Sequence, residues 1–197
     1  MNTGNPELRK ELSARSHDTN NAPLHVVEIE DLRAMYNHTI ELITPAADVN
    51  CPTCVAYALG LTFKSIQWDA SGRRNCLVGW VNEWTEFLEW YLPKLAARKN
   101  EPEEGDLIVY CLTGNPVPPH VGIAMSAARV RSKWGKGSVW AHDHWEVPEG
   151  FGDFIVAYKM PPREMSEVEL ARWVNIRCGG TLPQRHKRLS DGTLLLS

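Results

Sequence analysis

This chain of 197 residues contains five cysteines, and their thiols are the side chains that most suggest a chemical function. They are Cys51, Cys54, Cys76, Cys111 and Cys178. The chain starts with MNTGNPELRKELSARSHD, which is polar and lacks the apolar stretch of a signal peptide, so we expect a cytoplasmic protein. An odd number of cysteines in a reducing compartment does not predict a disulfide framework. The cysteines therefore point to a nucleophile, a metal site or a redox pair.

Cys54 has the setting that a nucleophile needs. Asn50 and Thr53 are good N-cap residues, and the run that follows Cys54 predicts a short buried helix ending at Gly60. A thiol at a helix start lies near backbone N–H groups and the positive end of the helix dipole. Both favour the thiolate, which is the nucleophilic form.

A nucleophilic cysteine also needs a base, which is most often histidine. His120 begins a predicted strand after a proline-rich loop, and a strand start that faces the helix start brings its imidazole to the sulfur. A polar group on a neighbouring strand can hold such an imidazole by its other nitrogen. We expect His142 in this role, ahead of Asp143, while Ser132 and Lys133 are untypical orienting groups. The predicted catalytic set is Cys54, His120 and His142.

Two other kinds of site fit the same residues. Cys51 and Cys54 have the C-x-x-C spacing of a zinc knuckle, which His142 and His144 could complete as a zinc-binding structural module. The same Cys-Pro-Thr-Cys segment also suits a redox pair, although such pairs follow the first strands of a βαβ unit. Cys51 is in addition a rival to Cys54 as the nucleophile. If Cys54 is the nucleophile of a hydrolase, we expect neither a metal nor a cofactor.

The elements that must position these residues follow an α+β order. We expect a mobile tail over residues 1–24, a helix over 26–43 and a second helix over 81–97 that Pro93 bends. Strands are predicted over 107–112, 120–125, 129–134, 138–141 and 154–160, with spacings that favour an antiparallel meander. A last helix is predicted over 165–176. This gives N-terminal helices packed on a small antiparallel sheet in a domain over 25–162, with a C-terminal helix and tail over 163–197.

Two stretches of the sequence resemble the papain-like cysteine hydrolases. The segment GDLIVY with PPHVGIAM after it is similar to the strand pair of the NlpC-like peptidases and CHAP amidases. The runs CVAYALG and RVRSKWGKGSVWAHDHWEVPEGFG resemble still more an uncharacterised bacterial papain-like family. The resemblance covers about residues 48–160. It implies a papain-like core with the cysteine on a helix and the histidine on the sheet.

That resemblance also implies an activity, the cleavage of an amide bond by a peptidase, amidase or deamidase. Its partner would be a peptide or protein substrate, with cell-wall peptide as the habitual substrate of the NlpC-like branch. A bacterial toxin or effector exported by a dedicated machine fits the missing signal peptide, and a catalytically inactive binding module keeps the fold without the activity.

Composition excludes other classes of partner. The formal net charge of -3 gives no electrostatic footprint for nucleic acid. No apolar run approaches the ~18 residues that a membrane span requires. With 43% hydrophobic residues, the chain can bury a core of its own.

Overall fold

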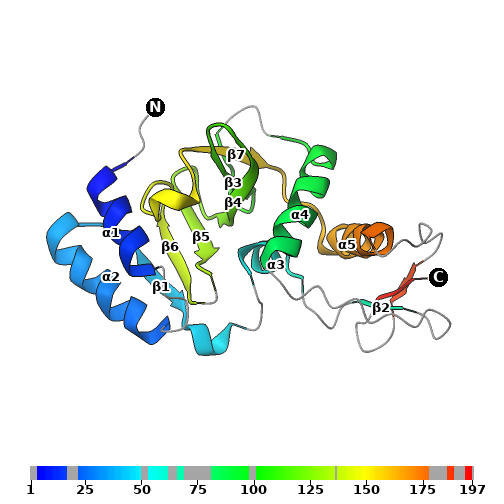
Figure 1. Ribbon diagram of the computed structural model, residues 1–197, viewed down its shortest axis with the longest axis horizontal. Coiled ribbons are helices and arrows are strands. Elements are labelled where there is room, and N and C mark those ends of the chain that lie inside the picture. The colour runs from blue at the N-terminus through cyan, green and yellow to red at the C-terminus, as the bar shows by residue number, and fades with distance from the viewer. Residues whose placement is uncertain are drawn as a thin grey trace.

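Six antiparallel strands form the sheet at the centre of the structure, a computed structural model that describes residues 4–16, 22–49, 53–61, 66–68, 81–97, 101–135, 137–177, 186–188 and 194–196 (Figure 1). The strand order is β1-β6-β5-β4-β3-β7. The bounds are β1 Glu41–Thr44, β3 Leu107–Leu112, β4 Asn115–Ala124, β5 Arg129–Lys133, β6 Val139–Asp143 and β7 Phe154–Tyr158. The α+β class and the antiparallel meander from β3 to β6 are as predicted.

Helices cover both faces of this sheet (Figure 1). On one side lie α1 and α2, with bounds Pro6–Ser16 and Ala22–Tyr36. On the other lie α3 (Cys54–Ala58), α4 (Val81–Tyr91) and α5 (Arg163–Arg177). Short 3-10 helices within the described residues are η1 Ala46–Asp48, η3 Leu92–Lys94 and η4 Glu149–Phe151. Pro93 lies in η3, so α4 ends at Tyr91 where the sequence predicted a bend.

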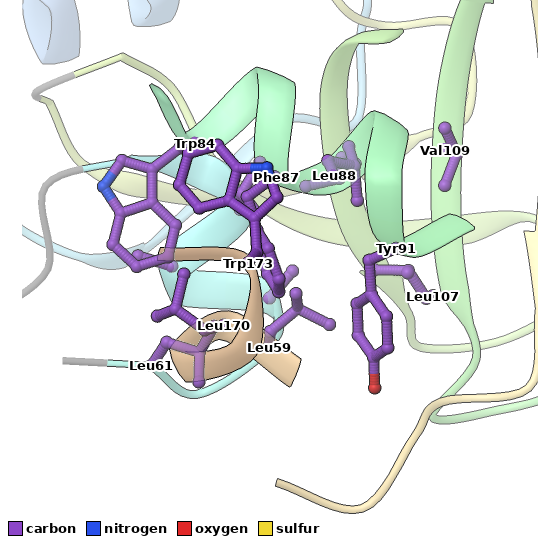
Figure 2. Close-up of a cluster of buried hydrophobic side chains, with 14 of the residues drawn as sticks. Leu59, Leu61, Trp84, Phe87, Leu88, Tyr91, Leu107, Val109, Leu170 and Trp173 are labelled. Atoms are coloured by element: carbon purple, nitrogen blue, oxygen red, sulfur yellow. The ribbon is translucent and has the colours of Figure 1, made fainter. Parts of the chain in front are cut away.

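The sheet separates two hydrophobic cores. The α3 core contains residues of α3, α4, α5 and one sheet face: Val55, Ala56, Ala58, Leu59, Leu61, Trp84, Phe87, Leu88, Tyr91, Leu107, Val109, Val121, Leu170, Trp173 and Val174. Figure 2 shows its centre, with Trp84, Phe87 and Tyr91 of α4 near Trp173 of α5. Phe87 stacks on Tyr91 with ring centroids 5.4 Å apart. The α1 core lies on the other face: Leu8, Leu12, Ile29, Leu32, Ile40, Ile108, Tyr110, Ala124, Val130, Trp134, Trp140, Val147 and Ala157.

Strand alternation decides which core each residue enters. On β3, Val109 belongs to the α3 core and Tyr110 to the α1 core. Their partners on β4 are Val121 and His120, respectively, and partners directly across an antiparallel pair share a face. His120 therefore lies on the α1-core face, and Val121 lies on the α3-core face.

The N-terminal segment differs from the expected mobile tail. Helix α1 is fastened to the sheet side by Leu8 and Leu12, which are 2% and 0% exposed. Its sequence is polar, but these two leucines are four residues apart and so lie on one helix face. Residues 1–3 and 17–21 of the expected tail lie outside the described residues.

The helix expected over residues 26–43 is also shorter than predicted. Asn37 has a left-handed backbone with φ of 48°, which ends α2 after Tyr36. The chain then becomes extended, and β1 pairs with β6. Ile40 and Ile43 continue the helical spacing by coincidence: Ile40 is fully buried in the α1 core, while Ile43 on β1 is exposed.

The expected boundary after residue 162 does not separate α5 from the rest. Leu170, Trp173 and Val174 of α5 are buried in the α3 core. Part of the expected C-terminal tail is also extended: β8 (His186–Arg188) and β9 (Leu194–Leu196) form a small sheet with β2 (Ile66–Trp68). In the part of the chain that the structure describes, no helix has the length and apolar character needed to cross a membrane.

Candidate functional site

Cys54 is the first residue of α3, as the sequence predicted. Thr53 caps the helix, and its Oγ1 accepts a hydrogen bond from the Ala56 N–H at 3.2 Å. The helix ends in a Schellman motif, in which Leu61 N donates to Ala56 O at 2.8 Å and Gly60 adopts a φ of 65°. A cap at each end thus fixes a helix of only five residues and places Cys54 against the sheet.

The surroundings of the Cys54 sulfur pull its pKa in two directions. Burial raises the pKa of the thiol above its ordinary value, and this is the largest effect. The backbone of Val121 and Val55 and the charge of Lys133 oppose it and favour the thiolate. Because burial dominates, the resting group is the thiol, and a nucleophilic role requires a base beside it.

Among the described residues, Lys133 is the ionisable side chain whose charge acts on the Cys54 thiol. It is the last residue of β5, it is 1% exposed, and its Nζ donates to the carbonyl oxygens of Gly135 at 2.6 Å and Gly137 at 3.1 Å. Helix α3 packs directly on β4 and β5. A lysine is rarely buried, because removing an ammonium from water is costly unless polar partners surround it.

The structure does not bring His120 to Cys54. Its ring stacks on Phe151 with centroids 3.8 Å apart, and it lies 5.4 Å from the ring of Tyr110, all on the α1-core face. Cys54 packs against the α3 core on the other side of the sheet. Burial lowers the pKa of His120 well below its ordinary value, with a further lowering by His142, so this imidazole is neutral at pH 7.

His142 shares a sheet face with His120, also away from Cys54. Its Nε2 lies 2.8 Å from Ser132 Oγ and its Nδ1 lies 2.7 Å from the carbonyl oxygen of Asp143. Because a carbonyl only accepts, Nδ1 carries the proton and Nε2 accepts from the serine hydroxyl. Trp134 Nε1 donates to the same Ser132 Oγ at 3.0 Å. Burial lowers the pKa of His142 to about 4.

The three predicted catalytic residues are thus divided between two faces. Cys54 lies on one, and His120 and His142 lie together on the other. The reason is the register of β4: Val121, which follows His120, is the residue whose backbone approaches the sulfur. Sequence reasoning weighed Lys133 only as an orienting group. The register puts Lys133 on the same sheet face as Val121, because Ile123 pairs with Arg131 on the neighbouring antiparallel strand. Alternation in the sequence groups these positions but does not say that α3 covers this face.

The residues of the alternative zinc site are also divided between the two faces of the sheet. His142 and Cys54 face opposite cores, and within the described ranges no group of three or more histidine, cysteine, aspartate or glutamate side chains is placed to hold a metal ion. Cys51, the other half of the C-x-x-C pair, lies outside the described residues, as do Cys76 and Cys178. Cys111 is a half-buried free thiol on β3.

Comparison of the chain with protein-family models, with curated proteins and with solved structures gives no match.

Proposed function

We propose that this protein is a thiol-dependent hydrolase that cleaves an amide bond, with Cys54 as the nucleophile and Lys133 as its base. The observation that carries the proposal is the buried Lys133 on β5, the strand on which α3 packs, whose charge favours the thiolate of Cys54 at the capped start of that helix. The chain order of a cysteine helix followed by an antiparallel sheet supports a papain-like core. The base differs from the one expected by resemblance, because His120 is on the far face.

The proposed reaction has two stages. The reaction starts from the neutral Lys133 amine and the Cys54 thiol. Nζ accepts the thiol proton as the sulfur attacks the substrate carbonyl carbon, and the C–N bond then breaks while the Lys133 ammonium so formed returns the proton to the leaving amine. Water hydrolyses the resulting thioester, with Lys133 again accepting and returning a proton, so that a carboxylic acid and the free thiol are released. The amide N–H groups of the first turn of a helix have no acceptor within the helix, and those at Cys54 and Val55 are suited to stabilise the developing oxyanion.

The proposed substrate is a peptide or protein amide. Expression of the protein in different compartments of a bacterial host tests where this substrate occurs. We expect the wild-type protein to impair the growth of a bacterial host when it is directed to one of two compartments, the cytoplasm or the periplasm. Cys54→Ala should remove this effect. Impairment in the periplasm would indicate cell-wall peptide, and impairment in the cytoplasm would indicate an intracellular target. Equal growth with both proteins in both compartments would favour a binding module.

Peptide turnover tests the chemistry itself. A peptide library is incubated with the full-length protein, and new amines and acids are identified by mass spectrometry. Cys54→Ala should abolish turnover, and Lys133→Met should reduce it by about 10²- to 10⁴-fold, as the loss of a general base does. Cys111→Ala removes the other described free thiol and should leave turnover unchanged.

His120→Phe separates the two possible bases. The replacement keeps a ring against Phe151 and removes both nitrogens. If Lys133 is the base, the folded variant retains turnover. If His120→Phe is folded but inactive while Lys133→Met is active, then His120 is the base and the role given to Lys133 is wrong.

A further inference from the structure

Residues 144–153 connect β6 to β7 and form what we call the strap, which contains η4. The strap lays two aromatic rings on the α1-core face of the sheet. Phe151 stacks on His120 with planes 20° apart, and Trp145 meets Tyr110 edge-on at 6.5 Å. The strap therefore covers His120 and Tyr110.

Helix α1 holds the strap in place from outside. The Arg9 guanidinium donates to three carbonyl oxygens of the strap, those of Val147 and Glu149 at 3.3 Å each and that of Gly152. Ser13 Oγ accepts a hydrogen bond from the Glu149 N–H at 2.9 Å. Arg9 is 6% exposed, so these bonds are shielded from water. One arginine thus joins α1 to both ends of η4.

The two histidines beneath this cover are buried without a carboxylate on either ring nitrogen. His120 is 2% exposed, and its Nε2 has no hydrogen-bond partner. The ring face of Phe151 attracts a cation but offers no hydrogen-bond acceptor. His142 is 0% exposed and makes its two bonds as a neutral ring. A proton on either ring would create a poorly solvated charge under the strap.

The elements packed around the α1 core carry these charged and titratable groups: Arg9 of α1, His25 of α2, His38 after α2, Tyr110 of β3, Arg129 of β5, Asp143 of β6, and His144, Glu146, Glu149 and Asp153 of the strap. His142 is the neighbour that acts electrostatically on His120, and it disfavours a charge there. Glu146 favours a charge on His142, whereas His144 and Arg129 oppose it. Ordinary imidazoles titrate near ~6.5 and carboxyls near ~4, so imidazoles gain charge first as the pH falls from neutrality.

We propose that the strap and α1 form an acid-released latch, in which proton uptake by His120 and His142 lifts the strap and detaches α1 while the α3 core stays folded. The closed form binds these protons more weakly than the open form, in which both rings meet water. The closed form is therefore fully favoured above about pH 6.5 and is lost progressively as the pH falls below it. Each histidine contributes up to about tenfold per pH unit to the opening equilibrium.

Hydrogen exchange of the full-length protein tests the latch. Protection factors of peptides from α1 and from α4 are measured between pH 7.5 and 5.0, with correction for the intrinsic exchange rate. We expect α1 protection to fall below about pH 6.5 and to lie below that of α4 at every pH, because α1 is released by a partial opening in which the α3 core stays folded. In His120→Phe, the slope of log protection of α1 against pH should be smaller by about one. Protection of α1 that does not change with pH, or that equals the protection of α4 at every pH, overturns the proposal.

Two further variants keep the test decisive. His38→Asn removes a buried histidine that follows α2 and whose ring bonds the backbone of Ile29 and Ile40, not the strap, and it should leave the α1 slope as in the wild type. A slope reduced as much by His38→Asn as by His120→Phe would contradict a specific latch. If His120→Phe does not fold, Arg9→Gln replaces it: α1 protection should fall at pH 7.5 and lie below that of α4, and an unchanged α1 would show that Arg9 does not fasten the strap.

Discussion

Ser132 Oγ and His142 Nε2 lie 2.8 Å apart in the interior of the α1 core, and both residues are 0% exposed. The serine hydroxyl donates to the imidazole and accepts from Trp134 Nε1, so each polar group of this chain of bonds has a partner. A fully satisfied buried network of this kind fixes the packing of the strands that carry it. It also determines which tautomer His142 adopts.

Removal of the serine hydroxyl should be costly. Ser132→Ala leaves His142 Nε2 and Trp134 Nε1 buried without partners, and each loss costs about 1–3 kcal/mol of unfolding free energy. Urea denaturation measures the change. Ser126→Ala is the matched control, because its Oγ accepts from backbone N–H groups in an exposed turn and its loss should cost much less. Equal costs for the two variants would contradict a structural role for the network.

Acid should weaken the fold through His142. Its pKa of about 4 lies below the ordinary value near 6.5, so its contribution to stability is complete above about pH 6.5 and is lost as the pH falls towards 4. The full loss amounts to about 3 kcal/mol. Denaturation at pH 7 and pH 4.5 measures it, and His142→Gln should flatten the dependence. An unchanged pH profile in that variant would assign the acid sensitivity to other groups.

Gly152 should not tolerate a side chain. Its φ is 147°, and a Cβ there would lie 2.7 Å from the carbonyl oxygen and 2.8 Å from the nitrogen of Cys111. Gly152→Ala should lower stability by about 2–4 kcal/mol through strain and overlap with the backbone of β3. Gly150→Ala is the control, because a Cβ at that position meets no atom within 4 Å. Similar melting temperatures for the two variants would contradict the close approach.

Helix α1 should contribute to the free energy of folding. Leu12→Ala removes a side chain that is 0% exposed and should cost about 2–5 kcal/mol, whereas Leu24→Ala alters a side chain that is 45% exposed and should cost little. Chemical denaturation compares the two. A Leu12→Ala protein as stable as the wild type would mean that α1 does not pack on the sheet in solution.

Much of the sheet and the setting of Cys54 could be predicted from the sequence, because local signals determine them. Alternating apolar residues between glycine and proline turns predicted the strands from β3 to β7. Thr53 and Gly60 predicted both ends of α3, and the structure shows a cap at each. These features depend on a few neighbouring residues and not on how the chain folds back on itself.

The partner of Cys54 could not be predicted in the same way. Alternation separates His120 from Val121 on a strand, but it does not say which of the two faces α3. That choice depends on how helices from distant parts of the chain divide between the two faces. The ordering of α1 was missed for a related reason, since its polar sequence gains stability only when Leu8 and Leu12 meet the sheet.

The alternation of β4 has a consequence for how the molecule can change. His120 and Val121 are consecutive, yet their side chains belong to cores that share no buried residue. Substitutions that repack one core should therefore add energetically to substitutions in the other, as independent sites do. The sheet separates the two cores, so substitutions can accumulate in the α1 core without disturbing the Cys54 thiol, which packs against the α3 core.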